Sequence, residues 1–162
     1  MDVVGLITGV IAAGFGLYLL SIWLIEYDRD FQTAAATRLP PSLLAGHVLA
    51  AVSGLLLWIA YLAWDSDRLA WYSLFGFLVA AALGLTMAYR WVSVYQAKQA
   101  SVRAAATFLA APVSGEAYAA AYSADVGPPE RNFPLGVVVA HGLFAVATLT
   151  LVLLTTVGVF DG

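Results

Sequence analysis

Two stretches of this chain share one pattern: LPPSLLAGHVLAAVSGLLL at residues 39–57 and FPLGVVVAHGLFAVATLTL at residues 133–151. Each opens on an apolar residue followed by a proline, and each carries a histidine seven residues after that proline. The match holds at a constant offset of 94 residues over about five helical turns. Because the two stretches do not alternate polar and apolar residues, they predict helices rather than strands of a membrane barrel.

Both stretches lie inside longer runs without a charged residue. Four such runs occupy residues 3–25, 39–64, 69–89 and 132–160, which are 23, 26, 21 and 29 residues long. A helix of about 20 apolar residues crosses the hydrocarbon core of a bilayer. The sequence therefore predicts a single transmembrane domain over residues 1–162, with spans at about 3–26, 40–64, 69–94 and 133–160.

The composition agrees with a membrane protein and excludes several classes of function. Of 162 residues, 62% are hydrophobic and 10% are charged, which is unlike a soluble domain. The net charge of −3 argues against nucleic-acid binding, which needs a basic face. Disulfides and thiolate metal sites are excluded because the chain has no cysteine.

The charges also predict an orientation. The first run is preceded by Asp2 and by no Lys or Arg, so we interpret it as a retained helix rather than a signal peptide. Arg68 alone belongs to the turn after the second run, whereas the other basic residues flank the loops after the first and third runs: Arg29, Arg38, Arg90, Lys98, Arg103 and Arg131. The positive-inside rule then predicts cytoplasmic loops and outer termini, in what we take to be a bacterial plasma membrane.

The connections differ in length. Residues 65–68 form a tight outer turn between antiparallel neighbours, with Trp64 and Trp71 as interfacial anchors. The inner connection is long and rich in alanine, which predicts that the third helix continues into the cytoplasm until Pro112.

Beyond that proline, Ser114 is positioned to cap a short helix with Tyr118 and Tyr122 on one face. The alternative is a surface linker with some helix in it, and the role of residues 96–131 stays open. The expected fold is all-α: an antiparallel four-helix transmembrane bundle built from a two-helix internal repeat, with a helical cytoplasmic segment between the third and fourth spans. The first and third spans match each other only weakly.

The two histidines of the chain occupy equivalent positions of the repeat. His47 and His141 both lie about 10 Å from the cytoplasmic end of their spans. Ionisable residues within spans usually face the bundle interior and mark functional sites. One alternative is that each imidazole only bonds a neighbouring helix. The other is a metal site at which both histidines ligate the iron of a b-type haem, which requires no cysteine.

Further residues suit such a cofactor. A flat porphyrin needs room, and glycines are available in every span: Gly46 and Gly142 beside the histidines, Gly14 and Gly16 in the first span, and Gly76 and Gly84 in the third. Glycine is also common in membrane helices for close packing alone. Three arginines, Arg38, Arg90 and Arg131, are candidate partners of the haem propionates, although topology explains them equally well. Met87 is an alternative axial ligand or a core side chain.

The plan of four spans with single histidines in the second and fourth resembles that of the membrane b-type cytochromes, the cytochrome b561-like group. The resemblance implies one haem b held by His47 and His141, and electron transport. Proteins of the b561 group proper have more histidines and more helices, so their two-haem path is not implied. The stretch from Phe133 to Ala145 is also similar to small four-helix bacterial membrane proteins of unassigned function.

Other chemistry fits less well. Ser53 is six residues from His47 and faces roughly the opposite side of its helix, so no hydrolase triad is visible. A transition-metal site would need more ligands, and Glu26, Asp28 and Asp30 lie at the membrane edge. Three hypotheses stay open: a haem-b electron-transfer subunit that works with a quinone or a redox protein, a non-catalytic scaffold or accessory subunit, and a small transporter. A quinone pocket beside the histidines is a variant of the first, and whether the protein is an enzyme stays open.

Overall fold

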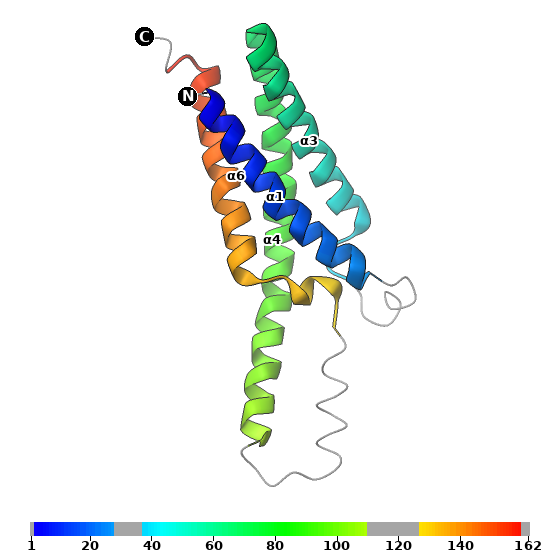
Figure 1. The fold of residues 1–162 in the computed structure, drawn as a ribbon. Coiled ribbons are helices and arrows are strands. Elements are labelled where there is room, and N and C mark those ends of the chain that lie inside the picture. The colour runs from blue at the N-terminus through cyan, green and yellow to red at the C-terminus, as the bar shows by residue number, and fades with distance from the viewer. Residues whose placement is uncertain (1, 28–36, 110–126, 160–162) are drawn as a thin grey trace.

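The computed structural model describes residues 2–27, 37–109 and 127–159, without the side chains of residues 105 and 107–109. Four long helices make up most of it: α1 (Asp2–Glu26), α3 (Pro41–Trp64), α4 (Asp67–Leu109) and α6 (Leu135–Thr156) (Figure 1). A short 3-10 helix, η1 (Pro129–Asn132), precedes α6. Throughout the described residues there is no strand, and the predicted all-α class is confirmed.

Each of the four helices is long and apolar enough to cross a membrane. This confirms the prediction of a membrane protein with four spanning helices. The predicted ends are close but not identical. The fourth span was placed at 133–160, whereas α6 begins at Leu135 and ends at Thr156, because Pro134 precedes its first turn and Gly158 takes a φ of 74° just after its last.

The third helix continues beyond the length of a span. Helix α4 has 43 residues and reaches Leu109, as the alanine-rich sequence predicts. The predicted stop at Pro112 and the predicted short helix with Ser114, Tyr118 and Tyr122 lie outside the described residues.

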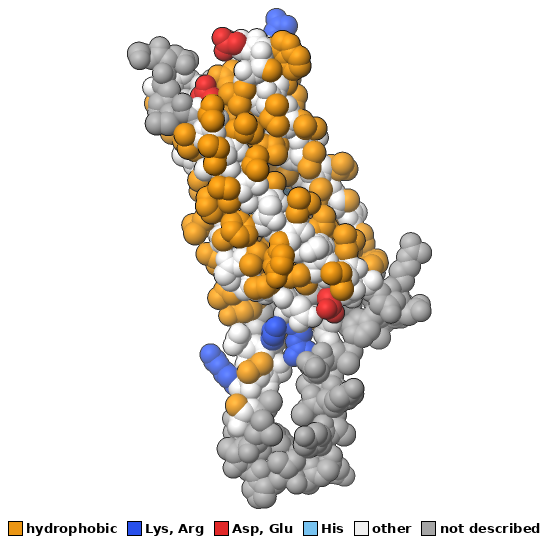
Figure 2. Space-filling view, in the orientation of Figure 1, with side chains coloured by type: hydrophobic (Ala, Val, Ile, Leu, Met, Phe, Trp, Pro, Cys, Tyr) orange, Lys and Arg blue, Asp and Glu red, His pale blue; other side chains and the backbone are white. Residues whose placement is uncertain are grey.

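The outer surface of the four helices is apolar. Large apolar side chains are exposed along every span, for example Leu17 in α1, Leu49 in α3, Leu85 in α4 and Leu143 in α6. Figure 2 shows this apolar surface over the body of the molecule, with Lys, Arg, Asp and Glu gathered at its two ends. A surface of this extent is stable against lipid tails and not against water.

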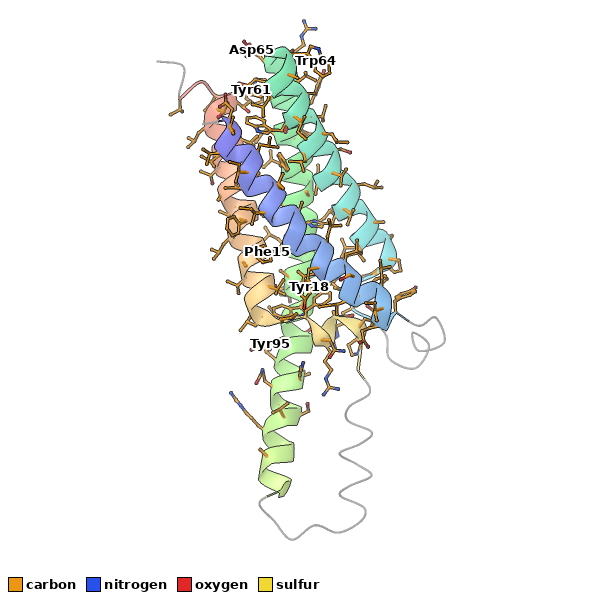
Figure 3. All side chains as sticks on the ribbon, in the orientation of Figure 1. Phe15, Tyr18, Tyr61, Trp64, Asp65 and Tyr95 are labelled. Carbon is orange, nitrogen blue, oxygen red and sulfur yellow. The ribbon has the colours of Figure 1, made fainter. Side chains whose placement is uncertain are left out.

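The helices form two packed pairs. In Figure 1, α1 and α4 run from the end that holds the N-terminus toward η1, whereas α3 and α6 run back. Helix α3 packs mainly against α4, and α1 packs mainly against α6. The first pair is joined by a tight turn in which Asp65 adopts a left-handed conformation, φ 50°, and its N–H bonds to the carbonyl of Tyr61 at 2.8 Å. Trp64 and Asp65 lie at that end of α3, far from η1 (Figure 3).

The two pairs cross their helices in different ways. Where α3 meets α4, a Cβ added to Gly76 would lie 3.1 Å from the Cα of Gly54, so the backbones touch. Where α1 meets α6, Thr148 Oγ1 donates to Thr8 Oγ1 at 3.0 Å. Small residues and hydroxyl bonds are the usual means of joining helices in lipid, where no hydrophobic force drives them together.

Buried side chains form two clusters along the molecule. The first, which we call the tryptophan cluster, lies toward η1 and consists of Trp23, Leu39, Leu44, Trp91 and Phe133. The second lies toward the termini and consists of Trp58, Ala70, Leu74 and Val152. In sequence, both histidines fall between the members that their helices contribute to these clusters, so the candidate site lies between two packed layers.

Candidate functional site

The fold brings the two histidines together. His47 extends from α3 and His141 from α6, and the centroids of their imidazole rings are 6.1 Å apart, with an angle of 69° between the ring planes. Both side chains are partly buried. No pale blue side chain appears on the face drawn in Figure 2. The expectation that the two imidazoles lie at one depth, one facing the other, therefore agrees with the structure.

Each histidine bonds the other helix of its pair. Nδ1 of His47 lies 2.9 Å from the carbonyl oxygen of Ala80 in α4, and Nδ1 of His141 lies 2.9 Å from the carbonyl oxygen of Ala12 in α1. A carbonyl oxygen can only accept, so Nδ1 carries the proton in both rings. In a neutral imidazole this leaves Nε2 with a free lone pair, which is the tautomer of a metal-ligating histidine whose other nitrogen is held by a carbonyl.

A glycine lies against each ring. A Cβ added to Gly84 would lie 3.1 Å from Cε1 of His47, and one added to Gly16 would lie 3.0 Å from Cε1 of His141. In both helices the glycine comes four residues after the alanine whose carbonyl accepts the histidine bond. Carbonyl and glycine thus lie one turn apart on one helix face and together set the position of the ring.

The glycines expected beside the cofactor are placed differently. Gly46 would contact only Leu83, at 3.5 Å, and Gly142 is exposed with open space where a Cβ would be. Among the six glycines considered from the sequence, the structure therefore brings Gly16 and Gly84 to the histidines. Gly76 is used at the α3–α4 crossing, and Gly14 has nothing within 4 Å of an added Cβ.

A second sequence match identifies these positions. Ala12, Ala13, Gly16, Leu17, Trp23 and Tyr27 of the first helix recur 68 residues later as Ala80, Ala81, Gly84, Leu85, Trp91 and Tyr95. The offset of 94 residues does not reveal this match, because the long α4 and the segment after it change the spacing between the two halves. A search with two offsets would have found the glycines.

The three arginines lie at the η1 end of the molecule. Arg90 Nη1 donates to the carbonyl of Arg38 at 3.2 Å, and Arg38 Nη1 donates to Ser93 at 3.0 Å. Arg131 is farther along α4, with Nη2 3.4 Å from Ser101. Arg38 and Arg90 are thus brought together and exposed, and Arg131 contacts a different part of α4.

Glu130 in η1 was not singled out from the sequence. It is fully buried, and its carboxylate accepts the N–H of Arg38 at 2.6 Å and the hydroxyl of Thr37 at 2.9 Å. The backbone carbonyl of Glu130 also accepts Trp91 Nε1–H at 3.1 Å. Nothing in the sequence distinguishes this glutamate from a surface residue, because its burial depends on contacts with segments 39 to 93 residues away.

Met87 packs against the tryptophan cluster, as a core methionine would. The described residues contain no group of three or more His, Asp or Glu side chains that could hold a bare metal ion. The site therefore offers two neutral imidazole nitrogens between apolar layers, which suits a metal whose other ligands come from a cofactor.

Comparison with protein-family models, with curated proteins and with solved structures finds no match to this chain.

Proposed function

We propose that this protein is a membrane electron-transfer subunit that holds one b-type haem through His47 and His141. The observation that carries the proposal is the separation of the two imidazoles. A metal bonded to both Nε2 atoms, with metal–nitrogen bonds of about 2.0–2.1 Å, requires ring centroids about 6.4 Å apart, and the observed separation is 6.1 Å.

The surroundings of the rings support the same proposal. Each Nδ1–H is bonded to a backbone carbonyl, which fixes the ring and directs Nε2 to ligation. Gly16 and Gly84 leave a place for each ring against the neighbouring helix. The haem would supply a one-electron iron couple, and the protein would supply two axial nitrogens and an apolar site.

The proposal includes the architecture expected from the sequence. The chain is an antiparallel bundle of two copies of a two-helix unit, the first formed by α1 and α3 and the second by α4 and α6. Two constant offsets, 94 and 68 residues, support the duplication. Under it His47 with Gly84 and His141 with Gly16 are equivalent contacts, and the agreement of their distances supports this.

The η1 end carries Arg38 and Arg90 and is the cytoplasmic end under the positive-inside rule. We propose an orientation with both termini outside, in a bacterial plasma membrane. Haem carboxylates at the η1 end would meet these two guanidinium groups. Since one haem on this side does not cross the hydrocarbon core of ~30 Å, a quinone or a redox protein would pass the electron on.

The test is a visible spectrum of the protein purified in detergent from cells with an adequate haem supply. We expect a Soret band that shifts on reduction with dithionite. His47→Ala and His141→Ala should each remove the six-coordinate spectrum. Met87→Leu is the matched control and should leave it unchanged, because that side chain packs in the tryptophan cluster. Colourless wild-type protein would contradict the proposal.

The second candidate is a non-catalytic scaffold or accessory subunit. One observation favours it: both histidines tie two helices together through bonds of 2.9 Å, which is a sufficient structural role. A protein that is colourless, and that stays folded when both histidines are replaced, would support this candidate instead.

A further inference from the structure

Two tryptophans occupy matching places below the histidine pair. Trp23 lies seven residues after Gly16, and Trp91 lies seven residues after Gly84, so each is two turns along the helix face that contacts a histidine. Both are almost fully buried, at 4% and 6% exposure. Each indole also lies against a tyrosine four residues on, with centroids 4.3 Å apart for Trp23 and 5.1 Å for Trp91.

The indole N–H groups of these two residues differ. Trp91 Nε1 donates to the carbonyl of Glu130 at 3.1 Å. Trp23 Nε1 is buried and has no hydrogen-bond partner among the described residues. An indole N–H can only donate, and a buried donor without an acceptor is costly and rare. The equivalent of a satisfied donor in one half is thus an unsatisfied donor in the other.

The unsatisfied donor belongs to the layer next to the candidate site. Trp23 packs in the tryptophan cluster with Leu44, which is three residues, one turn, before His47. The cluster lies on the η1 side of the histidines, the side on which Arg38 and Arg90 are found. An acceptor that reaches this layer from the histidine pair would therefore also approach two positive charges.

We infer that Trp23 Nε1–H binds a carboxylate of the group held between His47 and His141. This rests on the proposed function, since a b-type haem carries two carboxylates on one edge of an apolar ring. A carboxylate is an acceptor that an indole N–H and a guanidinium both recognise. The site is then asymmetric although its ligands are equivalent, because Trp91 donates to Glu130 and only Trp23 has a free N–H.

The test compares haem with haem dimethyl ester, in which both carboxylates are blocked. The affinity of the detergent-purified apoprotein is measured for each porphyrin by absorbance titration. Wild-type protein should prefer the free acid. Trp23→Phe should reduce that preference by about tenfold to hundredfold, which is the range for one hydrogen bond to a charged group. Trp91→Phe is the matched control and should keep the preference of the wild type.

A second measurement does not depend on a variant that folds. In protein labelled with ¹⁵N-tryptophan, the Trp23 indole N–H resonance is compared between apoprotein and dithionite-reduced haem protein. We expect a downfield shift on loading with haem and none with the dimethyl ester. A preference for the free acid that is unchanged in Trp23→Phe, or an indole resonance unmoved by haem, would overturn the inference while haem binding itself stands. Failure of wild-type protein to bind either porphyrin would instead overturn the proposed function.

Discussion

The imidazole rings of His47 and His141 lie 6.1 Å apart, although 94 residues separate them in the chain. Each ring is held in the same way, by one backbone carbonyl and one glycine of a neighbouring helix. Two imidazoles with their Nδ1 protons engaged and their Nε2 atoms free form a ligand pair that is arranged before any metal binds.

The contact between glycine and ring gives a first prediction. Gly16→Ala and Gly84→Ala should each weaken haem binding by about tenfold or more, because the new Cβ falls 3.0–3.1 Å from Cε1 of a histidine and displaces its ring. Titration of apoprotein with haem measures the effect. Gly142→Ala is the control, since it is beside His141 in sequence but meets open space. Equal losses in all three variants would contradict this explanation.

The buried carboxylate of Glu130 gives a second prediction. Glu130→Ala should lower the free energy of unfolding by about 3 kcal/mol, because it removes the acceptor of Arg38 N–H and of the Thr37 hydroxyl, and bonds to charged groups contribute about 1.5–3 kcal/mol each. Glu130→Gln keeps one acceptor oxygen and should cost less. Thermal unfolding in detergent measures both, with the exposed Glu26→Gln as control. A loss in Glu26→Gln as large as in Glu130→Ala would argue against the role of burial.

The threonine contact between α1 and α6 gives a third prediction. Thr148→Val keeps the shape of the side chain and removes the bond to Thr8, so it should destabilise the protein by about 0.6 kcal/mol and by no more than about 2 kcal/mol. Thr150→Val is matched to it, because Thr150 is exposed and bonds only the carbonyl of Val146 in its own helix. Equilibrium unfolding in mixed detergent should rank Thr148→Val below Thr150→Val. The reverse order would contradict the assignment.

The distribution of basic residues gives a fourth prediction, for the orientation. The chain has no cysteine, so single cysteines can report on each end of the molecule. In intact cells a membrane-impermeant maleimide should label Ser66→Cys, in the turn between α3 and α4. It should label Ala100→Cys, in the extension of α4, only after permeabilisation. The opposite labelling pattern would mean that the protein is inserted the other way round.

Much of the architecture could be predicted from the sequence. The four spans follow from charge-free runs, since a charge inside the hydrocarbon core is costly. The ends of α3 and α6 were found to within a few residues because prolines mark their starts. The extension of α4 beyond its span followed from its alanine content, and it was confirmed as far as Leu109.

The candidate site could be predicted only in part. The repeat identified both histidines, and they meet. Gly46 and Gly142 were chosen because they adjoin the histidines in sequence, but neighbours in a helix point about 100° apart, so neither lies against a ring. The glycines that do lie against the rings come from the partner helices, 37 residues from His47 and 125 residues from His141.

The sequence by itself determined which segments cross the membrane and which two side chains share one depth, because lipid excludes charge and because a helix has a constant rise per residue. Only the tertiary structure decided that α3 pairs with α4 and α1 with α6, that each imidazole meets a carbonyl and a glycine, and that Glu130 is buried. The physical reason is that spans which are apolar on every side carry no hydrophobic face to orient them. Their rotation is set by close packing and by hydrogen bonds between helices, which depend on residues far apart in the chain.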